Sequence, residues 1–152
     1  MRFFTELARN QTFWAAILSY VVASFLKVCI KFIKTKKLKP SLFISTGGMP
    51  SSHSSFVAGA TTSVGLIQGF DSPLFAMGAI ISIVVMYDAQ GVRRAAGKQA
   101  EAINRIIANF EHLDKVLEKE LKELLGHTPF EVFAGAALGV VLACIVHRLT
   151  TS

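Results

Sequence analysis

One polar segment, Gly47-Gly48-Met49-Pro50-Ser51-Ser52-His53, leads directly into an apolar run from Ser54 to Phe70. Glycine permits unusual backbone angles, proline suits the first turn of a helix, and serine is a good helix cap. The segment therefore predicts a helix start. The run behind it is apolar all round rather than striped, which favours a membrane span over a surface helix.

Three further apolar runs lie at Thr12 to Ile33, Pro73 to Tyr87 and Pro129 to His147. A bilayer core needs about 20 helical residues, so the two shorter middle runs should extend at their ends or lie in a thinned bilayer. The 52% hydrophobic content and mean hydropathy of +0.50 exceed ordinary soluble usage. We predict an all-α integral membrane bundle of about four transmembrane helices, with residues 1–152 as one domain. Four buried helices of a soluble bundle are the alternative.

A fifth segment, from about Gln99 to Leu125, has apolar residues at three- and four-residue steps, which indicates an amphipathic helix. Glu111 with Lys115, and Glu118 with Lys122, form favourable i,i+4 pairs on its polar side. Its apolar face could lie on the membrane, pack on the spans or pair with a second chain. A weaker hypothesis makes this helix a partner-binding or dimerisation device.

The net charge of +6 would suit nucleic acid or an anionic lipid surface. The apolar runs favour lipid, and the basic residues form no stripe with interleaved aromatics, so we expect no nucleic-acid partner. The connection after the first run carries four lysines and no acid, at positions 34, 36, 37 and 39. The positive-inside rule places this loop in the cytoplasm and both chain termini outside. Cys29 and Cys144 lie inside apolar runs, which indicates free thiols.

This topology brings three polar motifs to the cytoplasmic face, together with the amphipathic segment. In the first motif, His53 follows Ser51 and Ser52 on the first turn of a helix, where backbone N–H groups make a ready anion site. An imidazole at that place can donate a proton to a departing oxygen. A plain helix cap with an incidental histidine is the structural alternative.

In the second motif, His127 and Glu131 are four residues apart across a helix start and share one face. A carboxylate beside an imidazole fixes its tautomer, so His127 could attack phosphorus and form a phospho-histidine. A surface ion pair is the alternative. The two could also bind a metal with Asp88, although their spacing does not match an established metal motif.

The third motif holds Asp88, Arg93 and Arg94 around a turn at Gly91. The planar guanidinium fork suits phosphate oxygens, while basic residues just inside a span also serve as a topological signal. Asp88 could pair with one of the arginines. Lys27 lies deepest in the first apolar run, and because a charge within a span usually faces a cavity or a partner, it is the best lysine for binding phosphate.

Together these motifs resemble the divergent branch of the type-2 phosphatidic-acid phosphatase and vanadium haloperoxidase superfamily. Residues 50–53 resemble its Pro-Ser-Gly-His signature, and residues 127–131 resemble the end of its third signature, a His followed four residues later by an acid. The stretches 47–53, 87–94 and 126–132 are in combination specific to that branch. The resemblance covers roughly residues 11 to 148.

The resemblance implies a phosphatase that needs no metal or cofactor and acts on a lipid phosphate such as phosphatidylglycerophosphate, phosphatidate or an isoprenyl diphosphate. It makes His127 the nucleophile, Glu131 its orienting acid and His53 the acid for the leaving group. The phosphate would be held by Lys27, by backbone N–H groups near Ser51 and Ser52, and by Arg93 and Arg94. Asp88 and Gly48 would support these groups.

The chain departs from the superfamily at several positions. Ser52 replaces the usual glycine, Glu131 replaces the usual aspartate, and the arginine of the third signature would fall at Leu121. Arg93 and Arg94 would have to supply that charge from another place in the chain. If they do not, the alternative is a non-catalytic membrane protein that binds or translocates phosphorylated lipids. Membrane members of the superfamily usually have six spans, so four suggest a reduced core that a homodimer could complete.

Overall fold

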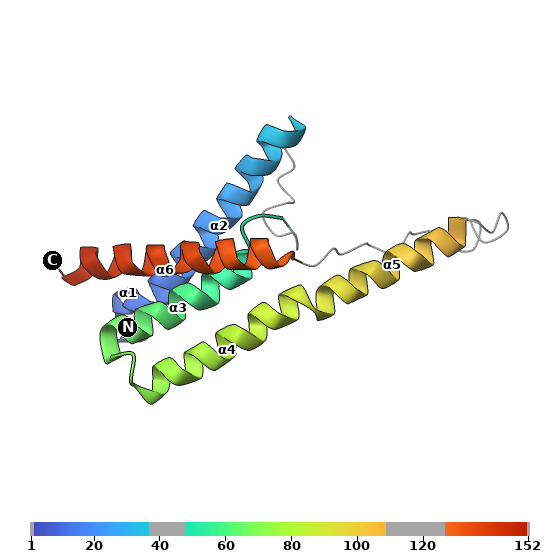
Figure 1. Ribbon diagram of the computed structural model, residues 1–152. Helices are drawn as coiled ribbons and strands as arrows, with labels where there is room; N and C mark the ends of the chain where they lie inside the picture. The colour runs from blue at the N-terminus through green and yellow to red at the C-terminus, as the bar shows by residue number, and fades with distance from the viewer. Residues whose placement is uncertain (1, 37–47, 109–126, 152) are drawn as a thin grey trace.

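A computed structural model of the chain describes residues 2–36, 48–108 and 127–151, all of which form helices or short connections without a strand (Figure 1). The helices are α1 (Arg2–Arg9), α2 (Gln11–Thr35), α3 (Ser52–Gln68), α4 (Pro73–Gln90), α5 (Val92–Ala108) and α6 (Pro129–Thr151). The predicted all-α membrane bundle is confirmed.

Side-chain caps set where three of the helices begin. The Asn10 side chain accepts a hydrogen bond from the Phe13 N–H, Ser51 accepts from Ser54, and Ser72 accepts from Phe75. Each cap satisfies one backbone donor that the first helical turn leaves without an intrahelical partner. In a bilayer such donors are costly to leave unpaired, so these polar residues mark the helix starts.

Helix α3 lies at the centre, against α2, α4 and α6. Its buried residues are all small: Ser52, Ser54, Ser55, Ala58, Gly59, Ser63 and Gly65. The glycines Gly135 and Gly139 of α6 lie directly against the α3 backbone, at Ser51 and Ser55 respectively. Small residues let helix backbones approach closely, which is how spans associate in lipid.

Hydrogen bonds between helices fix their directions. Ser55 Oγ donates to the Ser19 carbonyl at 3.1 Å, and Thr12 Oγ1 lies 3.3 Å from Ser63 Oγ, so α2 and α3 run antiparallel. At the same end, Gln11 Nε2 lies 2.9 Å from His147 Nδ1, near the end of α6. Helices α3 and α6 therefore begin together at the opposite end of the bundle, as Figure 1 shows.

Among the described residues, three helical stretches are long and apolar enough to cross a membrane: Gln11–Ile33, Pro73–Ile106 and Pro129–Thr151. The predicted run from Ser54 to Phe70 corresponds to α3, which has 17 residues and is held among the other helices. At 1.5 Å per residue, α3 spans about 25 Å, slightly less than a full bilayer core. This agrees with the short middle run expected from the sequence.

Helix α5 begins at Val92, earlier than the predicted start of the amphipathic helix at Gln99. Residues 92–98 are good helix formers apart from Val92 and Gly97, so nothing stops the helix from starting directly after the turn at Gly91. An exposed pair supports it, with Arg105 Nη2 at 2.6 Å from Glu101 Oε1. The rest of the predicted helix, with its pairs at 111–115 and 118–122, lies outside the described residues.

We expect Gly139→Ala to destabilise the protein, even though alanine is the better helix former. An added Cβ would meet the Ser55 carbonyl oxygen and lie 2.8 Å from the Gly59 nitrogen. Overpacking of this kind costs about 1–3 kcal/mol. Thermal unfolding of the purified protein in detergent measures the effect. Ala137→Val is the control, because Ala137 is exposed on the same helix; an unchanged melting temperature for Gly139→Ala would contradict the close α3–α6 contact.

Candidate functional site

The starts of α3 and α6 and the end of α4 meet at one end of the bundle (Figure 1). The Ser51 N–H donates to the Glu131 carbonyl oxygen at 3.0 Å, which joins α3 to α6. The His127 N–H donates to the Ala89 carbonyl oxygen at 3.1 Å, which joins the start of α6 to the last turn of α4. Two backbone hydrogen bonds thus hold three segments that are far apart in the sequence.

The start of α6 forms a capping box. The Thr128 N–H donates to Glu131 Oε2 at 2.9 Å, and the Glu131 N–H donates to Thr128 Oγ1 at 3.3 Å. This reciprocal pair satisfies two backbone donors that the helix start would otherwise leave open. It also holds the Glu131 carboxylate in one orientation. Thr128 was not among the residues predicted for the site, although Thr-x-x-Glu before an apolar run is the sequence signature of such a cap.

The same carboxylate oxygen faces the imidazole of His127. Glu131 Oε2 lies 3.4 Å from His127 Nδ1, and the histidine is only 3% exposed. With a carboxylate at Nδ1, the favoured neutral tautomer carries its proton on Nδ1 and a lone pair on Nε2. The arrangement therefore leaves Nε2 as the nitrogen that could accept a proton or attack an electrophile.

The Ser51 hydroxyl has a structural role, as the N-cap of α3. Ser51 is fully buried, and its Oγ accepts from the Ser54 N–H at 3.4 Å and from Ser54 Oγ at 3.0 Å. Ser52 is also buried, at 3% exposure. Both residues thus shape the helix start.

His53 follows on this helix start and lines a pocket of about 380 Å³ with Val84, Val85, Asp88 and Ala89 of α4. Ala89 is also the residue whose carbonyl accepts from His127. Both histidines therefore lie next to the last turn of α4. Within the part of the chain that the structure describes, Asp88 does not join a group of three or more metal-binding side chains.

Lys27 reaches this end of the bundle from α2. The residue is 3% exposed, on the helix face that also buries Ala23 and Ser24. A Cβ at Gly48 would lie 3.2 Å from Lys27 Cγ, and the φ of Gly48 is +91°, so a side chain there would strain the backbone and push against the lysine. Gly48 therefore lets the loop before α3 lie directly on the Lys27 stem.

The structure brings together eight of the predicted site residues at this end of the bundle: Lys27, Gly48, Ser51, Ser52, His53, Asp88, His127 and Glu131. Arg93 and Arg94 lie in the first turn of α5, directly after α4. Their side chains lie outside what the structure describes. Cys29 and Cys144 are free thiols, as expected.

A family model described as the divergent PAP2 family matches residues 8–142, a range that contains every residue of the candidate site. The chain is 43% identical over 152 residues to the uncharacterized membrane protein YuiD of Bacillus subtilis. This alignment covers 93% of the chain and 96% of YuiD. No solved structure matches the chain significantly.

Thr128→Ala should loosen the start of α6 and free the Glu131 carboxylate. Loss of a threonine cap costs about 1 kcal/mol, so backbone amides in the first turn of α6 should exchange with solvent roughly fivefold faster. Hydrogen–deuterium exchange by mass spectrometry over residues 127–132 measures this. Thr128→Ser keeps the hydroxyl and should exchange like the wild type; equal rates for both variants would mean that the capping box does not hold the helix start.

Proposed function

The chain belongs to the divergent PAP2 family, and on that basis we propose that it is an integral membrane lipid phosphatase. It would hydrolyse a lipid phosphate monoester or diphosphate through a phospho-histidine on His127. The pair of buried His127 and half-buried Glu131 carries the proposal, since the imidazole is oriented by a carboxylate that is itself held in a helix cap. The imidazole is here the nucleophile and the carboxylate fixes its orientation, which are two of the roles that covalent catalysis requires.

In the first step, His127 Nε2 attacks phosphorus, an N–P bond forms, and the P–O bond to the lipid breaks. His53 donates a proton to the departing lipid oxygen, so the lipid leaves as an alcohol, or as a lipid monophosphate where the substrate is a diphosphate. In the second step, His53 takes a proton from water as that water attacks phosphorus. The N–P bond breaks, inorganic phosphate leaves, and both histidines return to their initial state.

Positive groups around the transferring phosphoryl would stabilise its charge. The ammonium of Lys27 and the N–H groups of the first turn of α3, beyond the Ser51 N–H that already binds Glu131, would hold phosphate oxygens. Arg93 and Arg94 would supply the guanidinium charge that the superfamily places at the position of Leu121. Asp88, beside His53 in the pocket, would help to orient that histidine or one of the arginines.

A lipid substrate fits the position of these groups. They lie where apolar helices end, and large apolar side chains along α4 are exposed, among them Ile80, Ile83 and Val84. A lipid could keep its chains along these surfaces while its phosphate reaches the histidines. Phosphatidylglycerophosphate, phosphatidate and isoprenyl diphosphates all carry a phosphate at the polar end of long apolar chains.

His127→Ala should reduce phosphate release from these lipids to background, and His53→Ala should reduce it roughly 10²–10⁴-fold. The measurement is phosphate release by the purified protein in detergent, with and without a chelator, since the family resemblance implies activity without metal. Acid-labile phosphate trapped on His127 would identify the intermediate.

His147→Ala is the matched control, because His147 lies at the other end of α6, beside Gln11. It should keep wild-type activity. Lipid binding or translocation without turnover would instead favour the non-catalytic alternative, which the missing arginine at Leu121 motivates. Full activity of both His127→Ala and His53→Ala would exclude the mechanism.

We further propose that the site faces the cytoplasm and that both termini lie outside. The lysine-rich connection after α2 supports this orientation through the positive-inside rule. The start of α2 and the end of α6, joined by the Gln11–His147 hydrogen bond, lie at the end of the bundle away from the site. The two ends should therefore differ in access from outside.

Single cysteines test this orientation in a background of Cys29→Ser and Cys144→Ser. A membrane-impermeant maleimide added to intact cells should label Asp71→Cys, in the α3–α4 turn, and should spare Lys36→Cys, at the end of α2. Both should be labelled after the cells are broken. The reverse pattern in intact cells would invert the proposed orientation.

A further inference from the structure

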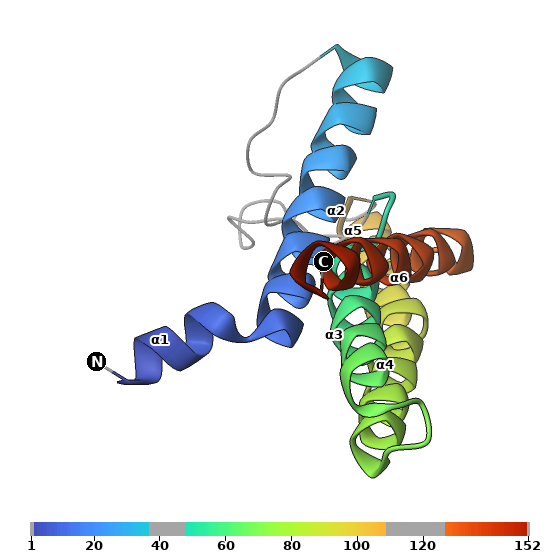
Figure 2. The same cartoon turned by 90° about the vertical axis from the view of Figure 1, so that its left-hand side faces the viewer.

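We infer that α1 is an interfacial helix that lies on the lipid headgroup layer of the leaflet opposite the candidate site. This helix was not predicted from the sequence, because eight residues are too few for a periodic pattern to stand out. The structure shows an α-helix over Arg2–Arg9, and Figure 2 shows it leaving the bundle sideways where α2 begins.

Helix α1 has one polar face and one apolar face. Arg2, Thr5, Glu6 and Arg9 follow the i, i+3, i+4, i+7 spacing of one helix face, and these four residues line one shallow pocket. Phe3, Phe4, Leu7 and Ala8 occupy the opposite face. A narrow apolar face of aromatic and aliphatic residues beneath a polar face with arginines is the pattern of a helix that lies in a membrane interface.

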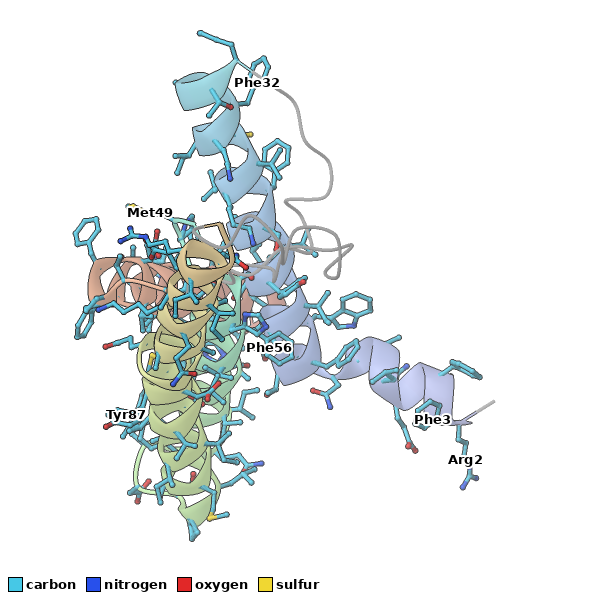
Figure 3. All side chains as sticks on the ribbon, turned by 90° about the vertical axis from the view of Figure 1, so that its right-hand side faces the viewer. Arg2, Phe3, Phe32, Met49, Phe56 and Tyr87 are labelled. Carbon is cyan, nitrogen blue, oxygen red and sulfur yellow. The ribbon has the colours of Figure 1, made fainter. Side chains whose placement is uncertain are left out.

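The bundle leaves most of the apolar face of α1 uncovered, and of its four residues Leu7 alone is half-buried. Phe3 is 66% exposed and Phe4 is 75% exposed, and α1 has no buried residue. Figure 3 shows Arg2 and Phe3 at the far end of α1, away from the other helices. An isolated helix shorter than about 12 residues is marginal in water, so α1 needs a surface on which to bury its apolar side.

The rest of the structure favours lipid as the surface that covers the apolar face of α1. Helix α1 joins the start of α2, a helix long and apolar enough to cross the membrane, through the single residue Asn10. Polar residues also gather at the level of this junction, since the residues from Arg9 to Thr12 line a pocket of about 620 Å³ with Gln68 of α3, next to apolar residues of α2, α3 and α4. The α1–α2 junction therefore lies where the chain passes from apolar core to headgroups.

Trp14 stabilises the α1–α2 junction. Its indole Nε1–H donates to the Ala8 carbonyl oxygen at 3.0 Å, and Asn10 caps α2 by accepting from the Phe13 N–H at 3.0 Å. Tryptophan is enriched at membrane interfaces because its ring is apolar and its N–H is polar. These two hydrogen bonds fix the sideways direction of α1. With that direction fixed, the apolar face of α1 can enter the leaflet while Arg2 and Arg9 reach lipid phosphates.

Spin labels on single cysteines test the inference in full-length protein reconstituted into phosphatidylcholine vesicles. The background is Cys29→Ser with Cys144→Ser, which keeps Trp14. Phe4→Cys and Leu7→Cys report the apolar face, and Thr5→Cys is the control on the polar face. Collision with oxygen, which concentrates in lipid, is compared with collision with a water-soluble nickel complex.

The ratio of oxygen to nickel collisions should be severalfold higher at positions 4 and 7 than at position 5. A low ratio at all three positions would place α1 in water and overturn the inference. A uniformly high ratio would make α1 part of the span, and collisions suppressed with both reagents at positions 4 and 7 would mean that protein, such as a second copy, covers the face. Either result would also overturn it. None of these outcomes bears on catalysis, which is tested separately.

Discussion

The close contact between α3 and α6 is the constraint on which the candidate site depends. Gly135 lies against the backbone of Ser51, and Gly139 lies against the backbone of Ser55. In lipid, burial of apolar surface gives little drive for two helices to associate, because lipid tails are as apolar as leucine. Close dispersion contacts and the hydrogen bond from Ser51 to Glu131 must hold these helices together instead. They fix two helix starts side by side.

Glu131 connects this contact to the chemistry. Its carbonyl accepts from Ser51 of the neighbouring helix, and its carboxylate both caps α6 at Thr128 and faces His127. Glutamate and glutamine are the residues that a capping box uses at the third position of a helix. This gives a physical reason for glutamate where the wider superfamily carries aspartate. A change that moves Glu131 would disturb the helix start, the histidine and the neighbouring helix together.

Local chemistry made much of the fold predictable. The four apolar runs became α2, α3, α4 and α6 with boundaries a few residues from those expected, because Asn10, Ser51, Ser72 and the proline at position 73 act within one helical turn. Helix α1 was missed because it is short, and the early start of α5 was missed because only Gly91 marks the end of α4. The capping role of Thr128 was predictable from the Thr-x-x-Glu pattern before an apolar run.

The sequence by itself determined a helical membrane protein with histidines at two helix starts. A bilayer leaves the backbone few alternatives to a helix, and capping depends on residues only three or four positions apart. The tertiary structure alone decided which of these starts meet, and that Lys27 lies beneath Gly48 beside them. That outcome depends on glycine and serine contacts between distant segments, where an added methyl group would hold the helices apart. A list of small residues in the sequence does not say which of them face each other.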